Sequence, residues 1–354
     1  MTACAEQLGK ASIPLVSVVI PTFNRAEMLR TAVRSVQAQT WPNVEIIIVD
    51  DGSTDNTDRV VRSLSCSLGN VRFVRQPHRG HGASRNAGLE MARGEWVLFL
   101  DDDDLLEPRC IETLLDAALS SNSPVVACRA IAFETPPAVT DPSQLRAGEP
   151  MVTTWHLFGV DLPAMVTIDE LALRPLFQTA AALFRRQVLE EVEGFDEHLP
   201  GAEDYDCWFK ILAVTGPFPL IEASLVWVRI HPHQTSAALF MMSEATHQVL
   251  SRVVSRHPTL EEQPEFRRRM ARLCRENAYA ALQRGDGKAA ARWCTEGLRW
   301  SRREWKLWIY GALARIPTVF PHLVRWKHPV RTHGTMASSR PTSPKRSPGD
   351  DPGM

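Results

Sequence analysis

An apolar run leads directly into four consecutive aspartates in the stretch Trp96-Val97-Leu98-Phe99-Leu100-Asp101-Asp102-Asp103-Asp104. This pattern predicts a buried strand that ends in a cluster of carboxylates. Clustered carboxylates repel one another, and loss of hydration disfavours their charged forms. A hard divalent cation with oxygen ligands would supply the missing counter-charge, and such a cation can also hold a diphosphate. The alternative is a solvated acidic loop, because runs of charge are usually exposed.

Strands and helices alternate over the first hundred residues. Short apolar, β-branched runs predict strands, and longer stretches with apolar residues on one stripe predict helices. We expect Pro21 to end the first strand and Asn24 to cap the first helix. The expected strands are 15–20, 44–49, 71–74 and 96–100, and the expected helices are 25–39, 54–64 and 84–92. This order predicts an α/β fold with a mostly parallel sheet that is flanked by helices on both faces.

Polar residues follow three of the expected strands, in segments 22–25, 50–55 and 101–104. Ligands of parallel sheets bind beyond the carboxyl ends of the strands. We therefore expect these three segments to converge on one crevice, which is a more specific signal than any one of them.

The pattern changes after residue 134. Residues 134–176 are irregular and contain several prolines, and a long loop-rich insert of this kind is more often functional than idle. Later periodic stretches predict helices at 186–193 and 204–213, a strand at 225–230 and a helical region from 243 to about 308, with a helical hairpin at 278–298. The hairpin is reminiscent of one tetratricopeptide unit, but one unit does not establish a repeat array.

These changes divide the chain into four parts. We expect an N-terminal extension (1–14), an α/β domain (15–237), a C-terminal helical region (238–325) and a disordered tail (326–354), in which Ser, Pro, Gly and charge dominate.

Composition restricts the class of protein. The chain has 354 residues, 44 % of them hydrophobic, and a formal net charge of -1, so nothing in it suggests a nucleic-acid partner. Its seven cysteines are scattered, and no two stand two residues apart, which argues against a disulfide framework and a zinc site. Reduced cysteines and an N-terminus without a signal-peptide pattern predict a cytoplasmic location.

One stretch, 305–324, is the most apolar of the chain but is interrupted by Lys306, Arg315 and two prolines. It is too interrupted to span a membrane. Its aromatic residues and the basic residues around it suit a lipid headgroup interface, so peripheral contact with the cytoplasmic membrane face through 303–325 is one expectation. Packing of the same residues against the α/β domain is the alternative.

Six segments in a fixed order carry a resemblance to a known family. They are Val18-Val19-Ile20-Pro21-Thr22-Phe23-Asn24-Arg25, Ile48-Val49-Asp50-Asp51-Gly52-Ser53-Thr54-Asp55, Gly82-Ala83-Ser84-Arg85-Asn86-Ala87-Gly88, Phe99-Leu100-Asp101-Asp102-Asp103-Asp104, Gly194-Phe195-Asp196-Glu197 and Glu203-Asp204-Tyr205-Asp206-Cys207-Trp208. Together they closely resemble the family 2 glycosyltransferases, inverting enzymes with the GT-A fold, over about residues 15–237. The resemblance implies a nucleotide-sugar donor such as a UDP-sugar, a divalent metal (Mn2+ or Mg2+) and a hydroxyl acceptor on a glycan, a lipid-linked molecule or a protein.

The resemblance assigns the donor site to residues at the strand ends. Thr22 and Phe23 would pack on the nucleotide base, with the Phe23 ring as a stacking face. Asp50, or Asp51 in second place, would accept a hydrogen bond from a base N–H, because a carboxylate only accepts. Arg85 would hold ribose or phosphate oxygens by paired bonds. The alternatives are a core role for Phe23, turn and cap chemistry for the aspartates, a surface ion pair for Arg85, and Arg79 in its place.

The acidic run matches the family pattern Asp-any-Asp. By this match Asp103 binds the metal, and Asp101 binds ribose or the metal. Asp102 stands at the variable position, so it remains a donor-site candidate. Asp104 is expected to cap a following helix. His231, after the last strand, would face the metal or the diphosphate, since imidazole suits manganese; a structural histidine is the alternative.

The pair Glu203-Asp204 matches the acidic pair of the family's catalytic site. By this match Asp204 is the general base and Glu203 orients it or the acceptor. The alternative is that one of the two only caps the helix that follows.

Two other functions compete with this interpretation. A nucleotidyltransferase can share a nucleotide-binding α/β domain, but it would show an N-terminal glycine-rich, lysine-containing phosphate loop, where this chain has residues 21–25. A catalytically inactive scaffold could use the C-terminal helices to bind a partner, but every acidic motif is retained.

Overall fold

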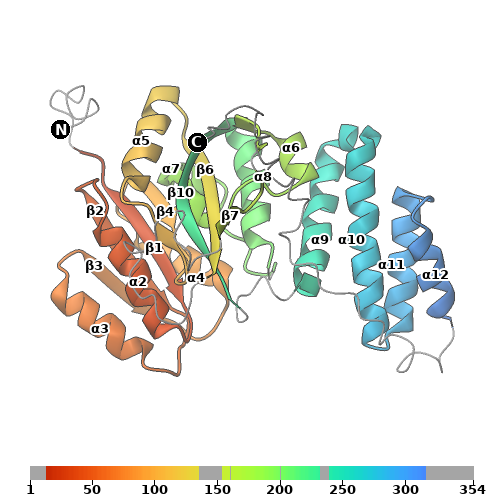
Figure 1. Cartoon of the computed structure of the whole chain (residues 1–354), viewed down its shortest axis with the longest axis horizontal. Coiled ribbons are helices and arrows are strands. Elements are labelled where there is room, and N and C mark those ends of the chain that lie inside the picture. Colours follow the sequence, from red (N-terminus) through yellow and green to blue (C-terminus); the bar gives the residue numbers. More distant parts are fainter. Residues whose placement is uncertain (1–12, 135–153, 160, 200, 232–238, 316–354) are drawn as a thin grey trace, which may run out of the picture.

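A mixed sheet flanked by helices forms one part of the molecule, and the helices α9 to α12 extend to one side of it (Figure 1). The structure is a computed structural model that describes residues 13–134, 154–159, 161–199, 201–231 and 239–315. Its strands are β1 (Val16–Thr22), β2 (Val44–Asp50), β3 (Val71–Arg75), β4 (Trp96–Phe99), β5 (Leu105–Leu106), β6 (Val125–Glu134), β7 (Thr154–His156), β8 (Met165–Val166), β9 (Ala182–Arg185) and β10 (Phe218–Ile230). The main path runs β3-β2-β1-β4-β9-β6-β10-β5, while β7 pairs with β6 and β8 pairs with β10.

The long pairings of the sheet are parallel. They join β1 to β2 and β4, β2 to β3, and β6 to β10, whereas β5, β7, β8 and β9 run antiparallel to their partners. Every residue of β1 is buried, as expected for a strand covered on both faces. The predicted α/β class with a mostly parallel sheet is confirmed.

Helices cover both faces of the sheet (Figure 1). The described helices are α2 (Ala26–Gln37), α3 (Thr57–Ser67), α4 (His81–Met91), α5 (Cys110–Ser121), α6 (Ile168–Leu173), α7 (Arg186–Glu191), α8 (Glu203–Thr215), α9 (Leu239–Arg256), α10 (Pro264–Gln283), α11 (Gly287–Trp300) and α12 (Trp305–Leu313). The chain passes from β1 through β2 to β3 toward one edge of the sheet, and then returns to place β4 on the other side of β1. Because crossover connections are right-handed, this change of direction places α4 on the face opposite to α2 and α3. Helix α4 begins three residues earlier than the sequence predicts, and it lies so close to β1 that a Cβ on Gly88 would stand 2.2 Å from the Val19 side chain.

Two local expectations at the end of β1 are wrong. Pro21 does not end the strand, because it lies inside β1 opposite Val49. Asn24 does not cap α2. It adopts a left-handed conformation with φ of 55°, and its Oδ1 instead accepts hydrogen bonds from the backbone N–H groups of Thr54 and Asp55. Asn24 therefore joins the turn after β1 to the turn after β2.

The insert that we expected at 134–176 is partly regular. Strands β7 and β8 and helix α6 lie within its described portion, and residues 135–153 are outside the described residues. Thr167 caps α6 by accepting a hydrogen bond from the Glu170 N–H at 3.1 Å.

The C-terminal helices pack on one another at the end of the molecule farthest from β3 (Figure 1). Helices α10 and α11 form the predicted hairpin, and the Asp286 carboxylate caps α11 by accepting from the Ala289 N–H at 2.8 Å. Arg252 of α9 joins this region to the sheet domain through Asp196 (3.0 Å) and Asp206 (3.3 Å). Within the described residues, no helix is long and apolar enough to cross a membrane.

Candidate active site

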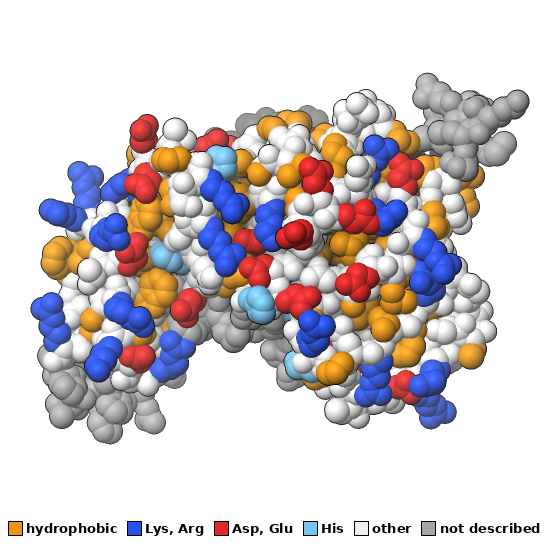
Figure 2. All heavy atoms as spheres, turned by 180° about the vertical axis from the view of Figure 1, so that it is seen from behind, with side chains coloured by type: hydrophobic (Ala, Val, Ile, Leu, Met, Phe, Trp, Pro, Cys, Tyr) orange, Lys and Arg blue, Asp and Glu red, His pale blue; other side chains and the backbone are white. Residues whose placement is uncertain are grey.

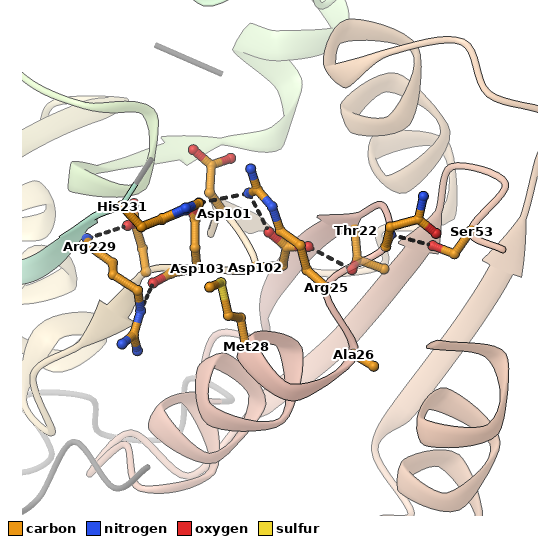
Figure 3. Close-up of polar contacts among 12 residues, drawn as sticks. Thr22, Arg25, Ala26, Met28, Ser53, Asp101, Asp102, Asp103, Arg229 and His231 are labelled. Atoms are coloured by element: carbon orange, nitrogen blue, oxygen red, sulfur yellow. Dashed lines mark hydrogen bonds and ion pairs between the residues drawn. The ribbon is translucent and has the colours of Figure 1, made fainter. Parts of the chain in front are cut away.

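The acidic run lies at the carboxyl end of the sheet, beside the end of β1 (Figure 3). The Thr22 hydroxyl donates to Asp102 Oδ2 at 2.6 Å. One Arg25 guanidinium nitrogen stands 3.0 Å from Asp102 Oδ1 and 2.7 Å from Asp103 Oδ2. The expected convergence of these two segments is therefore present. We did not predict a role for Arg25, although it is the one cation in the polar segment 22–25 after the first strand.

Strand β10 brings a second group of residues to the run. His231 Nε2 lies 2.9 Å from Asp103 Oδ2, and the Arg229 side chain donates to the Asp103 carbonyl at 3.0 Å. Asp104 accepts from the Arg229 backbone N–H at 3.0 Å. The prediction that Asp104 caps a helix is wrong, because the next two residues form β5, which pairs with β10. This antiparallel pairing carries Arg229 and His231 to the carboxylates.

Burial raises the pKa of two carboxyl groups in the acidic run, Asp102 and Asp104. Asp102, Asp103 and Asp104 are all less than 9 % exposed, which excludes a solvated loop. Burial and the neighbouring Asp103 raise the pKa of Asp102 to about 7. Burial likewise raises the pKa of Asp104 well above its ordinary value. Burial acts in the same direction on Asp101, but the Arg85 guanidinium outweighs it and lowers the pKa of that carboxyl. The negative charge of the buried carboxylates is therefore not fully balanced by the neighbouring arginines, and a further cation at the site would stabilise their ionised forms.

The residues at this point fit a divalent cation. Asp103 and His231 present a carboxylate and an imidazole side by side, which are both suitable ligands for manganese. Among the described residues, no group of three His, Cys, Asp or Glu side chains encloses a cation position. Magnesium-type sites usually need only one or two carboxylates, because water and substrate phosphates complete the shell.

Arg85 connects the acidic run to the start of α8. Its guanidinium donates to Asp101 Oδ1 at 3.0 Å and to Glu203 Oε1 at 2.8 Å. The Arg85 side chain is only 5 % exposed and lies over the Phe195 ring, 5.5 Å from its centre. Arg85 is thus not the surface ion pair that was our alternative. Asn86, which we quoted but gave no role, fixes the turn beneath it by exchanging two hydrogen bonds with the Phe195 backbone, each 2.9 Å.

Glu203 and Asp204 occupy different environments at the start of α8. Both Glu203 oxygens are engaged, one by Arg85 and the other by the Gly201 N–H at 2.9 Å, and the residue is buried. Asp204 is half-buried and accepts from the Thr179 hydroxyl at 2.9 Å and from the Tyr205 N–H at 2.7 Å. Burial and the neighbouring Glu203 raise the pKa of Asp204. Of the two, Asp204 is the carboxylate that a substrate can reach.

The two aspartates after β2 are already committed to the loops around them. Asp50 is fully buried, and its Oδ1 accepts from the Ser53 N–H at 2.8 Å. Its Oδ2 accepts no hydrogen bond from the residues that the structure describes and lies 3.5 Å from the Arg75 Nε. Asp51 instead accepts from the backbone N–H groups of Arg79 and Gly80, at 2.9 and 2.8 Å. Asp51 therefore shapes the glycine-rich segment that precedes α4.

An aromatic face stands at the same edge of the sheet. Phe23 is 38 % exposed and stacks on His78, with ring centres 4.2 Å apart and planes 22° from parallel. Phe23 is thus not a core residue, which was our alternative. We did not predict His78, and its place in the segment beside Gly80 is the only signal for it.

Comparisons with known proteins place this chain among glycosyltransferases. The family model described as "Glycosyl transferase family 2" matches residues 17–192. An uncharacterized glycosyltransferase of Rickettsia felis is 31 % identical over 228 residues, which cover 63 % of this chain and 35 % of that protein. The chain spans about a third of the length of most curated relatives that it matches.

Solved structures share the fold. S. aureus TarS 1–349 in complex with UDP-GlcNAc superposes with a TM-score of 0.55 at 18 % identity, covering 85 % of this chain and 90 % of that one. The mannosyltransferase PcManGT from Pyrobaculum calidifontis, in complex with GDP-Man and Mn2+, superposes with a TM-score of 0.53 at 19 % identity, covering 86 % of this chain and 87 % of that one.

Proposed function

Because this chain belongs to glycosyl transferase family 2, we propose that it transfers a sugar from a nucleotide-sugar donor to an acceptor hydroxyl with inversion at the sugar carbon. One observation carries the proposal. Arg85 ties the acidic run at Asp101 to the Glu203-Asp204 pair, so groups suited to a diphosphate and a group suited to a base lie on two sides of one guanidinium. Direct displacement needs such an arrangement, because the acceptor oxygen bonds to the sugar carbon on the face opposite to the one from which the nucleoside diphosphate departs.

The donor that we propose is a UDP-sugar. Phe23 offers its exposed ring to the base. Asp50 Oδ2, which accepts no hydrogen bond from the described residues, is the oxygen that we propose for a base N–H, with Asp51 in second place. Thr22 and Asp102 line the path from the base toward the diphosphate. The neighbours named above are in complex with UDP-GlcNAc and with GDP-Man, which supports a nucleotide sugar as the class of donor.

Asp103 and His231 would hold a Mn2+ or Mg2+ ion, with Asp101 as a further ligand or a ribose contact. When bound, such an ion offsets the charge that develops on the leaving diphosphate. Arg25 contacts the Asp103 carboxylate and Arg229 donates to the Asp103 backbone carbonyl, so the two arginines together hold this residue in place.

Asp204 would remove the proton from the attacking hydroxyl. Its raised pKa suits a group that must accept a proton. Glu203 is fully engaged and acts as a positioning residue through Arg85. The acceptor hydroxyl would belong to a glycan, a lipid-linked molecule or a protein.

Release of nucleotide tests this function. The full chain is incubated with a panel of nucleotide sugars, with manganese and with a chelator, and released nucleotide is detected by mass spectrometry. We expect slow, metal-dependent hydrolysis of one donor even without an acceptor. A chain that releases nucleotide from no donor under either condition would behave as a scaffold, and activity that survives the chelator would remove the metal from the proposal.

The variant Asp103→Asn is expected to weaken binding of UDP in the presence of manganese by about tenfold or more, because it loses a charged metal ligand. The fold should persist, since the change relieves repulsion with the buried Asp102. Calorimetric titration measures the affinity, and Asp58→Asn, which changes an aspartate of α3, is the control. Equal affinity of Asp103→Asn and the parent chain would rule out Asp103 as a ligand.

The pH dependence of kcat should report the environment of Asp204. The base acts only when it is deprotonated, so kcat falls as the pH falls through a pKa that lies above the ordinary 3.8. The variant Glu203→Gln removes one cause of the raised pKa, so the acid limb of its profile should move to lower pH. A limb that stays in place or moves upward would show that another group sets it.

A further inference from the structure

We propose that the exposed face of α12 and the basic residues around it form a docking surface for an anionic lipid bilayer. The exposed face consists of Trp305 (61 % exposed), Trp308 (57 %) and Ile309 (45 %). Residues three or four apart share one side of a helix, so these side chains form a continuous apolar stripe. Soluble proteins seldom leave two neighbouring tryptophans uncovered without a partner for them.

The other side of α12 fixes the helix to the molecule. Leu307 is fully buried against α10 and α11, and Tyr310 is half-buried against the same pair. Tyr310, an aromatic residue of the same stretch, turns its ring toward Tyr279 of α10, with ring centres 5.8 Å apart, so it is not part of the exposed stripe. Residues 316–324 of this apolar stretch, Val319 among them, lie outside the described residues.

The alternative from the sequence, packing of this stretch on the catalytic domain, does not apply to α12. Its main contacts are with α10 and α11, and it lies at the end of the molecule opposite β3 (Figure 1). The exposed stripe is therefore available at one end of the elongated molecule.

Charge identifies the occupant as anionic. Residues 239–315 contain 15 Lys and Arg against 8 Asp and Glu, whereas residues 1–238 contain 19 against 31. Figure 2 shows basic side chains spread over the C-terminal helices. Arg302 and Arg303 are exposed just before α12, and Lys306 lies over the Trp305 ring at 5.7 Å. The acidic residue beside them, Glu304, is paired with Arg275 at 2.9 Å.

Two other occupants carry the wrong charge. A second copy that packed symmetrically, stripe against stripe, would bring its own basic residues against this surface, and head-to-tail pairing through the acidic residues 1–238 of a second copy is an outcome of the sedimentation test. Residues 316–354 contain six Lys and Arg against two Asp, so their net charge has the same sign as that of this surface. Anionic lipid headgroups attract the arginines and lysine, while tryptophan side chains are favoured at the boundary between headgroups and acyl chains.

Cosedimentation of the full chain with vesicles tests the proposal. We expect binding to vesicles that contain phosphatidylglycerol, little binding to pure phosphatidylcholine vesicles, and weakening as salt screens the charges. Arg302→Gln/Arg303→Gln should lower the partition coefficient about fivefold for each charge removed. Trp305→Ser/Trp308→Ser should lower it further, and the control Leu119→Ser/Val214→Ser, which removes exposed apolar side chains of α5 and α8, should not.

The possible outcomes separate the alternatives. Circular dichroism confirms that each variant folds, and sedimentation equilibrium gives its oligomeric state. Parental binding by either the tryptophan or the arginine variant would overturn the proposal. A dimer of the parent chain that dissociates in the tryptophan variant would assign the stripe to a second copy instead. These readouts need no donor or acceptor, so they are independent of the proposed transferase activity.

Discussion

Replacement of Asp204 by asparagine is expected to lower kcat by about a hundredfold or more and to leave donor affinity nearly unchanged. A loss of this size is usual when a general base is removed. Asparagine keeps an acceptor for the Tyr205 N–H, and its amide can donate to the Thr179 oxygen, so the local geometry should persist. The thermal stability should stay the same or rise slightly, because the variant removes a carboxylate whose charge is disfavoured by burial and by Glu203.

The measurement is a steady-state assay beside a calorimetric titration with the donor nucleotide. Asp206→Asn is the matched control, because Asp206 lies in the same turn of α8 but pairs with Lys210 and Arg252 instead of facing Thr179. If Asp204→Asn transfers sugar at the parental rate, Asp204 only helps to start α8, and Glu203 becomes the candidate base.

The fold could be predicted from the sequence because its parallel half is encoded locally. Each strand of that half is a short apolar run, and each helix carries one apolar stripe, so the pattern alone gives their order. The convergence of Thr22 with the acidic run follows from the same order, since carboxyl ends of parallel strands share one edge. The pairing of Asp103 with His231 was accessible only through the family resemblance, because 128 residues separate them.

The corrected assignments share a physical cause. Asp104 and Asn24 both looked like helix caps, which is a local property of a short polar residue before an apolar run. In the folded chain each bonds to a distant segment instead, Asp104 to β10 and Asn24 to the turn after β2. Arg25 and His78 were overlooked for the same reason, since their partners are brought to them by the sheet and leave no periodic signal.

The variant Arg85→Met should be the most destabilising single change in the site, with a loss of about 3–5 kcal/mol in the free energy of unfolding. Removal of one partner from a buried ion pair leaves an uncompensated charge, and that is the usual cost. Arg85 is buried and holds both Asp101 and Glu203. Arg79→Met is the matched control. Its ion pair with Glu197 is largely exposed and should contribute about 1 kcal/mol or less.

Urea denaturation as a function of pH distinguishes this charge effect from a simple loss of packing. Arg85 lowers the pKa of Asp101 in the folded state below the ordinary 3.8. The stability that this interaction contributes is present above pH 3.8 and is lost as the pH falls through the lowered pKa, when the carboxylate takes up a proton. The difference between the parent chain and Arg85→Met should therefore shrink in acid. A difference in the free energy of unfolding that is independent of pH would assign the effect to the contact of Arg85 with the Phe195 ring. A loss of stability no larger than that of Arg79→Met would show that Asp101 and Glu203 do not depend on Arg85.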